Sequence, residues 1–372
     1  MTELSIPQEL LPADGRFGAG PSKVRVEALE NLARTGAQLL GTSHRQAPVK
    51  AQVGRLQHGI RTLFSVPDDW DVLLAVGGAT AFWESLAFGF VEQRARHYSF
   101  GEFSSKFAAA TRAAPWLDDP DVVESPPGTA PDATAAPGCD VQALTHNETS
   151  TGVAQTLARV DDALVVVDGT SAAGGLAFDL ADVDVYYFSL QKGFASEGGL
   201  TVALCSPAAT ARIEEVAASG RYVPTFLDLQ TALDNARRQQ TYNTPSVSTI
   251  VLAADQVEWM IERFGDLVGS AARQREKAAT IYDWAEQRDW ATPFVADPAH
   301  RSDVVATIDL EDTVQADDVN AILRASGVVD TDGYRKLGRN QLRVAMFPAI
   351  DPDDLVAYTR CVDWVVDRLR AG

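Results

Sequence analysis

The sequence contains little cysteine. Its 372 residues include only Cys139, Cys205 and Cys361, which lie far apart and form no CxxC pair. Three widely spaced cysteines argue against a disulfide framework and against a zinc site. We therefore expect no bound metal and a reducing, cytoplasmic location.

Positive charge and long apolar runs are also scarce. The chain has 32 Lys and Arg residues against 51 Asp and Glu residues, which gives a net charge of −19. Nucleic acid is therefore not an expected partner, because binding to its phosphates needs clustered cations. Residues 1–7 have no basic or apolar region, and apolar runs such as 163–167 are short, so we expect neither a signal peptide nor a membrane span.

The few cations form two clusters. One is His44-Arg45 and the other comprises Arg335, Lys336, Arg339 and Arg343. A strongly acidic protein repels anions at long range, so an anion ligand would need such a local group of positive charges. For any single arginine, a solvated surface position is the commoner explanation.

Apolar runs predict a parallel sheet in the first two thirds of the chain. The continuous runs 164–167 and 185–188 are typical of strands covered on both faces. A third strand is predicted at 72–76, followed by Gly77-Gly78-Ala79-Thr80 and a helix over 81–91. A strand, a glycine-rich turn and a helix together present backbone N–H groups to a phosphate.

The fold class predicted is α/β, a mainly parallel sheet with helices on both faces and a smaller C-terminal α/β domain. The predicted division is an N-terminal arm (1–16), a large domain (17–262) and a small domain (263–372). Further elements are expected as helices at 24–40, 316–324 and from 353, and as strands at 304–310 and 342–347. Gly265 is a possible kink in a helical pattern that starts at 257, and the proline-rich segment 115–137 is expected to be an exposed connection.

Two residues at predicted strand ends carry chemistry. Asp168 follows one strand, and Lys192 follows the next, 24 residues later. A buried lysine has a lowered pKa and an amine free for imine chemistry. Pyridoxal phosphate (PLP) needs such a lysine for its Schiff base and a carboxylate opposite its ring nitrogen. Alone, Lys192 could be a solvated strand-end lysine and Asp168 a helix cap.

Short motifs along nearly the whole chain resemble those of the class V aminotransferases, and among them the members that act on phosphoserine. They are Phe17-Gly-Ala-Gly-Pro-Ser22, Ser43-His44-Arg45, Asn147-Glu148-Thr149, Gln191-Lys192-Gly193, Tyr242-Asn243-Thr244-Pro245 and Arg343-Val-Ala-Met-Phe-Pro348. The resemblance implies a fold-type I PLP enzyme. It also implies a homodimer whose active sites are shared between subunits.

The resemblance implies the following cofactor site. Lys192 forms the Schiff base and moves the proton at the substrate, Asp168 pairs with the ring nitrogen, and Thr149 donates to the ring phenolate. The phosphate of PLP is held by Ala79, Thr80, Thr170 and Gln191, and from the other subunit by Asn243 and Thr244. Phe103 stands where the family commonly places a tryptophan over the cofactor ring, and it can still stack with less area.

The implied reaction is reversible amino transfer from L-glutamate to 3-phosphohydroxypyruvate, giving O-phospho-L-serine and 2-oxoglutarate, a step of serine biosynthesis. His44 and Arg45 would bind the substrate phosphate, and Arg343 the α-carboxylate. Many members have a His-Arg pair shortly before that arginine. Here the histidine is missing, and Arg335, Lys336 or Arg339 could substitute.

Other functions stay open at this point. A serine–pyruvate or alanine–glyoxylate aminotransferase would not need the His44-Arg45 cluster. A cysteine desulfurase needs a reactive cysteine on a mobile loop, which none of the three cysteines resembles. A PLP-fold binding protein without catalysis, and use of a related substrate of pyridoxine synthesis, are further alternatives.

Overall fold

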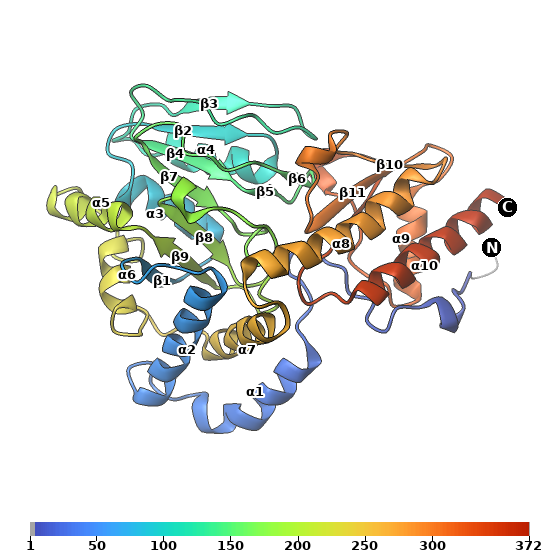
Figure 1. The fold of residues 1–372 in the computed structure, drawn as a ribbon, viewed down its shortest axis with the longest axis horizontal. Coiled ribbons are helices and arrows are strands. Elements are labelled where there is room, and N and C mark those ends of the chain that lie inside the picture. Colours follow the sequence, from blue (N-terminus) through green and yellow to red (C-terminus); the bar gives the residue numbers. More distant parts are fainter. Residues whose placement is uncertain (1–3, 372) are drawn as a thin grey trace.

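The computed structural model describes residues 4–371, and its main feature is a seven-stranded sheet (Figure 1). In spatial order the strands are β1 (Asp71–Val76), β9 (Leu200–Cys205), β8 (Val185–Ser189), β7 (Leu164–Asp168), β4 (Val141–Thr145), β2 (Ala95–Ser99) and β3 (Asp121–Glu124). Strand β9 is antiparallel to both of its neighbours, and the pairs from β8 to β3 are parallel. The mainly parallel sheet predicted from the apolar runs is confirmed.

Helices cover both faces of this sheet, because its strands are apolar on both sides. Along β8, Tyr186 and Phe188 pack into one core, whereas Val185 and Tyr187 pack into the other. The first core includes residues of α2 (Ala47–Leu63) and α7 (Val247–Phe264). The second includes residues of α3 (Ala79–Gly89), α4 (Glu102–Arg112), α5 (Pro207–Ala218) and α6 (Leu229–Ala236).

The C-terminal part has its own sheet and core. Its antiparallel strands are β10 (Ala291–Pro293), β11 (Val305–Leu310) and β12 (Gln341–Ala345), packed with α8 (Leu267–Glu286), α9 (Ala316–Ala325) and α10 (Pro352–Ala371). Ile6 and Phe17 of the N-terminal segment are buried in the same core. The predicted boundary at 262/263 falls near the end of α7, and the division into domains stays a prediction.

Smaller elements complete the described chain. They are α1 (Val26–Leu39), the hairpin of β5 (Asn147–Glu148) and β6 (Val153–Ala154), and the 3₁₀ turns η1 (Gln8–Leu10), η2 (Leu180–Asp182), η3 (Pro298–His300) and η4 (Arg335–Leu337). Helix α1 lies beside α7 (Figure 1). Within residues 4–371, no helix has the length and apolar character needed to cross a membrane.

Two local predictions differ from the structure. Gly265 does not kink a helix; it ends α7, with a φ of 83° and its N–H donating to Ile261. Segment 115–137 is not only a connection, because it contains the edge strand β3. Pro120 and Pro126 flank that strand without interrupting it, and an edge position leaves one side of the strand free of pairing.

Candidate active site

Lys192 lies at the centre of the candidate site, in the turn after β8. Its side chain is buried, and Nζ donates a hydrogen bond of 2.9 Å to Thr149 Oγ1. The segment before α1 closes over it, since Ser22 Oγ donates to the Lys192 carbonyl at 2.8 Å. A Cβ on Gly20 would lie 2.7 Å from Lys192 Cε, so only glycine fits there without a shift.

The burial of Lys192 changes its chemistry. Loss of water around the ammonium lowers the pKa of Lys192 to about 8, and nearby Arg343 lowers it further, although Asp168 and Glu148 act in the opposite direction. Roughly a tenth of the amine is therefore uncharged at pH 7 and able to act as a nucleophile or a base, far more than for an ordinary lysine.

Asp168 ends β7, and β8 lies parallel beside it, so both strand-end residues reach the same edge of the sheet. The Asp168 carboxylate is 4% exposed and accepts a hydrogen bond on each oxygen. Trp83 Nε1 of α3 donates to Oδ2 and the Thr170 amide donates to Oδ1, both at 2.9 Å. This carboxylate is fixed in orientation, as a partner of a protonated ring nitrogen must be.

Aromatic and cationic side chains line one side of Lys192. Its Nζ lies 5.3 Å from the centre of the Phe103 ring, which lies 5.9 Å from the ring of Tyr334. The Arg343 guanidinium lies 5.5 Å from the Tyr334 ring and donates to the Thr149 carbonyl at 3.3 Å. The structure therefore brings together four predicted residues, Lys192, Thr149, Phe103 and Arg343.

Arg343 is a largely buried cation without an anionic partner in the described chain. It forms no ion pair within residues 4–371, and its buried Nε has no hydrogen-bond partner there. Burial lowers the pKa of Arg343, against the attraction of Tyr334 and Asp332. A guanidinium that is mostly removed from water and lacks a carboxylate is suited to bind a ligand carboxylate with two hydrogen bonds.

Glu148 and Trp83 hold residues of the candidate site in place, a role that the sequence did not predict. The Glu148 side chain is fully buried, and its Oε2 accepts hydrogen bonds from the Phe103 and Ser104 amides and from Ser104 Oγ. It thereby fixes the first turn of α4 and the position of Phe103. The motif Asn147-Glu148-Thr149 marked Glu148, but nothing in the sequence distinguished Trp83 from a core tryptophan.

A set of polar groups without partners surrounds the strand ends. Buried side-chain oxygens of Thr170, Ser189 and Gln191 have no hydrogen-bond partner within the described chain. Predicted Ala79 and Thr80 form the first turn of α3, whose N-terminus has no side-chain cap. The two hydroxyls and the free helix N-terminus can donate hydrogen bonds to a phosphate ester, and Gln191 could do so through its side-chain amide nitrogen.

The other predicted residues form a separate group. The His44 imidazole is buried, and its Nδ1 lies 3.2 Å from Thr244 Oγ1, whereas Nε2 has no partner within residues 4–371. Arg45, Asn243 and Thr244 are exposed. In the described chain no hydrogen bond or ion pair joins this group to Lys192.

Three cations near Arg343 differ in their contacts. Lys336 pairs with Glu102 at 2.5 Å, and Arg339 pairs with Asp309 at 2.5 Å and lies over Phe294. Arg335 is exposed and forms no ion pair with a residue of the described range.

The cysteines do not resemble a reactive site. Cys205 is buried in β9, and burial raises its pKa well above the usual thiol range. Cys361 is buried in α10, and burial raises its pKa to about 11. Both are therefore thiols at neutral pH, which disfavours cysteine desulfuration.

Comparison with known proteins identifies the class of this site. Residues 129–336 match the model of the family described as aminotransferase class-V. The chain is also 57% identical over 371 residues to the phosphoserine aminotransferase of Nocardioides sp. strain JS614, covering 98% of this chain and 99% of that one. The chain belongs to the class V aminotransferase family.

Solved structures agree on the fold. The phosphoserine aminotransferase of Cytophaga hutchinsonii superimposes with a TM-score of 0.87 at 24% identity, over 94% of this chain and 99% of that one. The PLP-bound phosphoserine aminotransferase of Trichomonas vaginalis gives a TM-score of 0.79 at 20% identity, over 94% and 99%. These likenesses confirm the predicted fold-type I architecture.

Proposed function

We propose that this protein is a PLP-dependent aminotransferase that transfers an amino group between L-glutamate and 3-phosphohydroxypyruvate, giving O-phospho-L-serine and 2-oxoglutarate. The observation that carries the proposal is the buried Lys192, with a pKa lowered to about 8, beside the fixed carboxylate of Asp168 at the same sheet edge. Identity of 57% to a phosphoserine aminotransferase supports the choice of substrate.

The residues present fit PLP. Lys192 would supply the amine for the aldehyde, and Asp168 would supply a carboxylate acceptor for the ring nitrogen. The unpartnered hydroxyls of Thr170 and Ser189 and the uncapped first turn of α3 suit its phosphate, to which the side-chain amide nitrogen of Gln191 could also donate. When bound, PLP supplies an electron-withdrawing ring that stabilises negative charge at the substrate Cα.

Within that chemistry, the side chains have distinct tasks. Lys192 would take the proton from the substrate Cα and would return it later to complete the amino transfer. Its lowered pKa leaves part of the amine uncharged at neutral pH, and the uncharged amine can act as the base. Asp168 keeps the ring nitrogen protonated, and Trp83 and the Thr170 amide hold Asp168 in place. Arg343 binds the α-carboxylate common to both amino acids.

The substrate phosphate needs a second set of cations. Arg335 is the best candidate within the chain, because Lys336 and Arg339 already pair with Glu102 and Asp309. His44 and Arg45 would add a free imidazole nitrogen and an unpaired guanidinium. The same cations would accept the side-chain carboxylate of glutamate.

We infer a homodimer, because no hydrogen bond or ion pair within the described chain joins His44, Arg45, Asn243 or Thr244 to Lys192. Two exposed apolar side chains, Leu40 and Tyr242, lie near them in the sequence, and the exposed Phe226 lines a small hollow together with Tyr242 and Asn243. Such side chains favour a protein–protein interface. In the dimer, these four polar residues of one subunit would complete the site of the other.

The proposal also includes a division into two domains at 262/263, a cytoplasmic location, a role in serine biosynthesis and use of a pyridoxine-pathway substrate.

The test is the absorbance spectrum of the PLP-loaded protein before and after addition of single amino acids. Phosphoserine and glutamate should each convert the cofactor to its amino form, whereas serine and alanine should scarcely do so. Equal conversion by serine or alanine would leave an aminotransferase but contradict the phosphate subsite, and would favour a serine–pyruvate or alanine–glyoxylate activity. No conversion by any of the four would contradict catalysis.

A further inference from the structure

A cavity of about 510 Å³ lies outside the candidate active site. Its walls come from three parts of the chain that are distant in sequence: the N-terminal segment 14–27, the end of α7 with the first half of α8, and residues 348–352 at the start of α10. The cavity therefore lies where the N-terminal segment meets α7, α8 and the start of α10. A ligand in it would contact all three.

The lining of this cavity is basic, although the protein is acidic. Its charged members are five basic residues, Lys23, Arg25, Arg263, Arg273 and Lys277, and three acidic ones, Asp14, Glu27 and Asp351. This local excess of positive charge occurs in a chain with a net charge of −19. Such a concentration of cations creates a local field that attracts anions.

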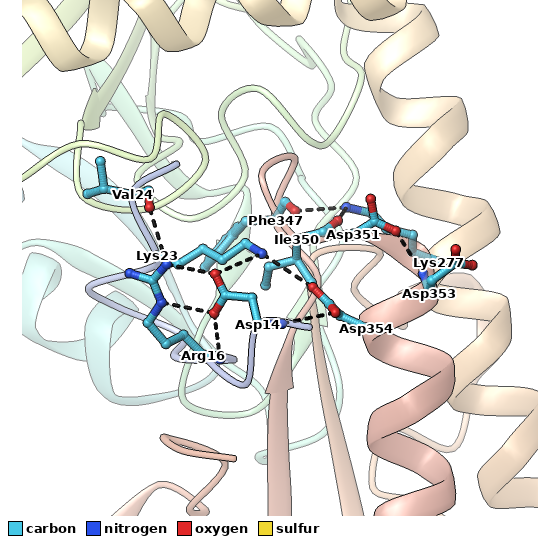
Figure 2. Close-up of polar contacts among 10 residues, drawn as sticks. All are labelled: Asp14, Arg16, Lys23, Val24, Lys277, Phe347, Ile350, Asp351, Asp353 and Asp354. Carbon is cyan, nitrogen blue, oxygen red and sulfur yellow. Dashed lines mark hydrogen bonds and ion pairs between the residues drawn. The ribbon is translucent and has the colours of Figure 1, made fainter. Parts of the chain in front are cut away.

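Lys277 is the unusual member of the set. It is 2% exposed, and Nζ donates to the backbone carbonyls of Phe347 at 2.8 Å and Ile350 at 3.2 Å (Figure 2). Among the described residues no carboxylate lies within ion-pair distance of it. Lys23, by contrast, lies 3.4 Å from Asp14 and 3.5 Å from Asp354 (Figure 2).

A buried ammonium without a counter-ion is costly. Burial holds the pKa of Lys277 well below the ordinary lysine value, and the charges of Arg273 and Lys23 act in the same direction, whereas Asp351 opposes them. Two carbonyl acceptors leave one of the three ammonium N–H groups free. An anion in the cavity would accept a hydrogen bond from this N–H group and would favour the charged form of Lys277.

Two surface arginines extend this positive region. Arg263 is exposed, lies 5.6 Å from the Trp259 ring and has no ion-pair partner in residues 4–371. Arg273 is partly exposed and pairs with the exposed Glu276, in the weak kind of pair that a ligand can replace. The Arg25 guanidinium also lies over Trp259, 4.7 Å from the centre of its ring.

We propose that this cavity binds a small oxyanion with at least two negative charges, held by Lys277, Arg263 and Arg273. Phosphate esters and dicarboxylates share this chemistry. Guanidinium groups bind either through paired N–H donors, and the Lys277 ammonium adds a third contact from the buried side.

The site is connected to Lys192 through the N-terminal segment. Residue Lys23 lines the cavity, and its neighbour Ser22 donates from its amide to the Gln191 carbonyl and from Oγ to the Lys192 carbonyl, each at 2.8 Å. An anion that orders segment 23–27 would therefore also order the turn that carries Lys192.

The test is a titration of the PLP-loaded enzyme with inorganic phosphate, followed by Trp259 fluorescence. The double variant Arg263→Gln/Arg273→Gln should bind phosphate about 100-fold more weakly, since each of the two lost charged hydrogen bonds is worth a factor of roughly ten. Both residues are on the surface, so the variant should fold. Trp259→Phe identifies the signal, which should disappear in it.

Two controls separate this site from others. Arg368→Gln removes a matched arginine that lies over Trp364 on α10, and it should leave the titration unchanged. Arg335→Gln changes the candidate active site and should also leave it unchanged. A titration with succinate in place of phosphate tests which class of anion the cavity binds. Binding of phosphate alone indicates a phosphorylated ligand, and binding of both anions indicates recognition by charge. Absence of a saturable signal with either anion, or an unchanged titration in the double variant, would overturn the proposal.

Discussion

The two groups of candidate site residues differ in how they are held. Lys192, Asp168 and Thr149 are buried and hydrogen-bonded within one chain, and the strand ends fix them at one sheet edge. Arg45 and Thr244, by contrast, are exposed and lie in loops. The difference supports the proposed dimer, in which one chain holds most of the cofactor pocket and exposed residues of the partner complete the site.

Lys192→Ala should have the largest effect on the buried group. Transamination of glutamate should fall by at least about 10⁴-fold, because both the covalent attachment and the proton transfer are lost. Steady-state assays measure the loss, and circular dichroism should show an unchanged fold. A variant that retained a tenth of the activity would exclude Lys192 as the base.

Arg343→Gln should come next. We expect a fall of about 100-fold in kcat/KM for glutamate and phosphoserine alike, because a paired guanidinium–carboxylate contact is lost from both. Arg339→Gln is the matched control, since Arg339 already pairs with Asp309 on β11, and its kcat/KM should change less than about twofold. Equal effects of the two substitutions would contradict the assignment of the carboxylate site.

Arg335→Gln should raise KM for phosphoserine about tenfold. Lys336→Gln, one residue away, should have little effect, because Lys336 is exposed and paired with Glu102. Kinetics with phosphoserine separate the two variants. A larger effect of Lys336→Gln than of Arg335→Gln would contradict this assignment and would show that Lys336 contacts the substrate phosphate.

The rate at which apoprotein combines with PLP should rise about tenfold between pH 7 and pH 9. Burial lowers the pKa of Lys192 to about 8, and the reactive amine is the uncharged form present above that pKa. The same lowered pKa affects stability. Between pH 8 and the ordinary lysine pKa, Lys192 binds more protons in the unfolded chain than in the folded one, so the free energy of unfolding of the apoprotein should increase with pH in that window. A rate that is flat across this range would contradict the lowered pKa.

Trp83→Phe should have the smallest effect, a loss of a few-fold in kcat. The phenyl ring retains most of the packing against Phe107, but Asp168 loses one donor. The pH titration of the cofactor absorbance should also shift, which a purely structural role would not cause. Trp284→Phe removes a matched indole hydrogen bond to Asp363 in the C-terminal part and should leave kcat and the absorbance titration unchanged.

The sequence predicted the parts of the molecule that depend on strong local patterns. Asp168 and Lys192 follow continuous apolar runs, which is why their strands and their common edge could be predicted. Trp83 was missed because an indole in an apolar helix looks like core, and only the tertiary structure brings it 2.9 Å from a carboxylate 85 residues away. Arg335 could not be distinguished from Lys336 and Arg339 either, since ion pairs with Glu102 and Asp309 depend on the fold.

Topology was harder to predict than the presence of strands. The apolar residues 200–205 indicate a strand, but not that β9 runs antiparallel between β1 and β8. Strand β3 was hidden among prolines that lie at its ends. In both cases the pairing partner decides the structure, and that partner is distant in sequence.

The most direct test of the shared site is complementation between two inactive variants. Lys192→Ala and Arg45→Gln, each with little activity toward phosphoserine, would be produced together so that mixed dimers form. If Arg45 serves the partner's site, each mixed dimer has one intact site, and random mixing should restore about a quarter of the normal activity. A mixture no more active than the variants alone would show that Arg45 and Lys192 act within the same chain, and would contradict the account.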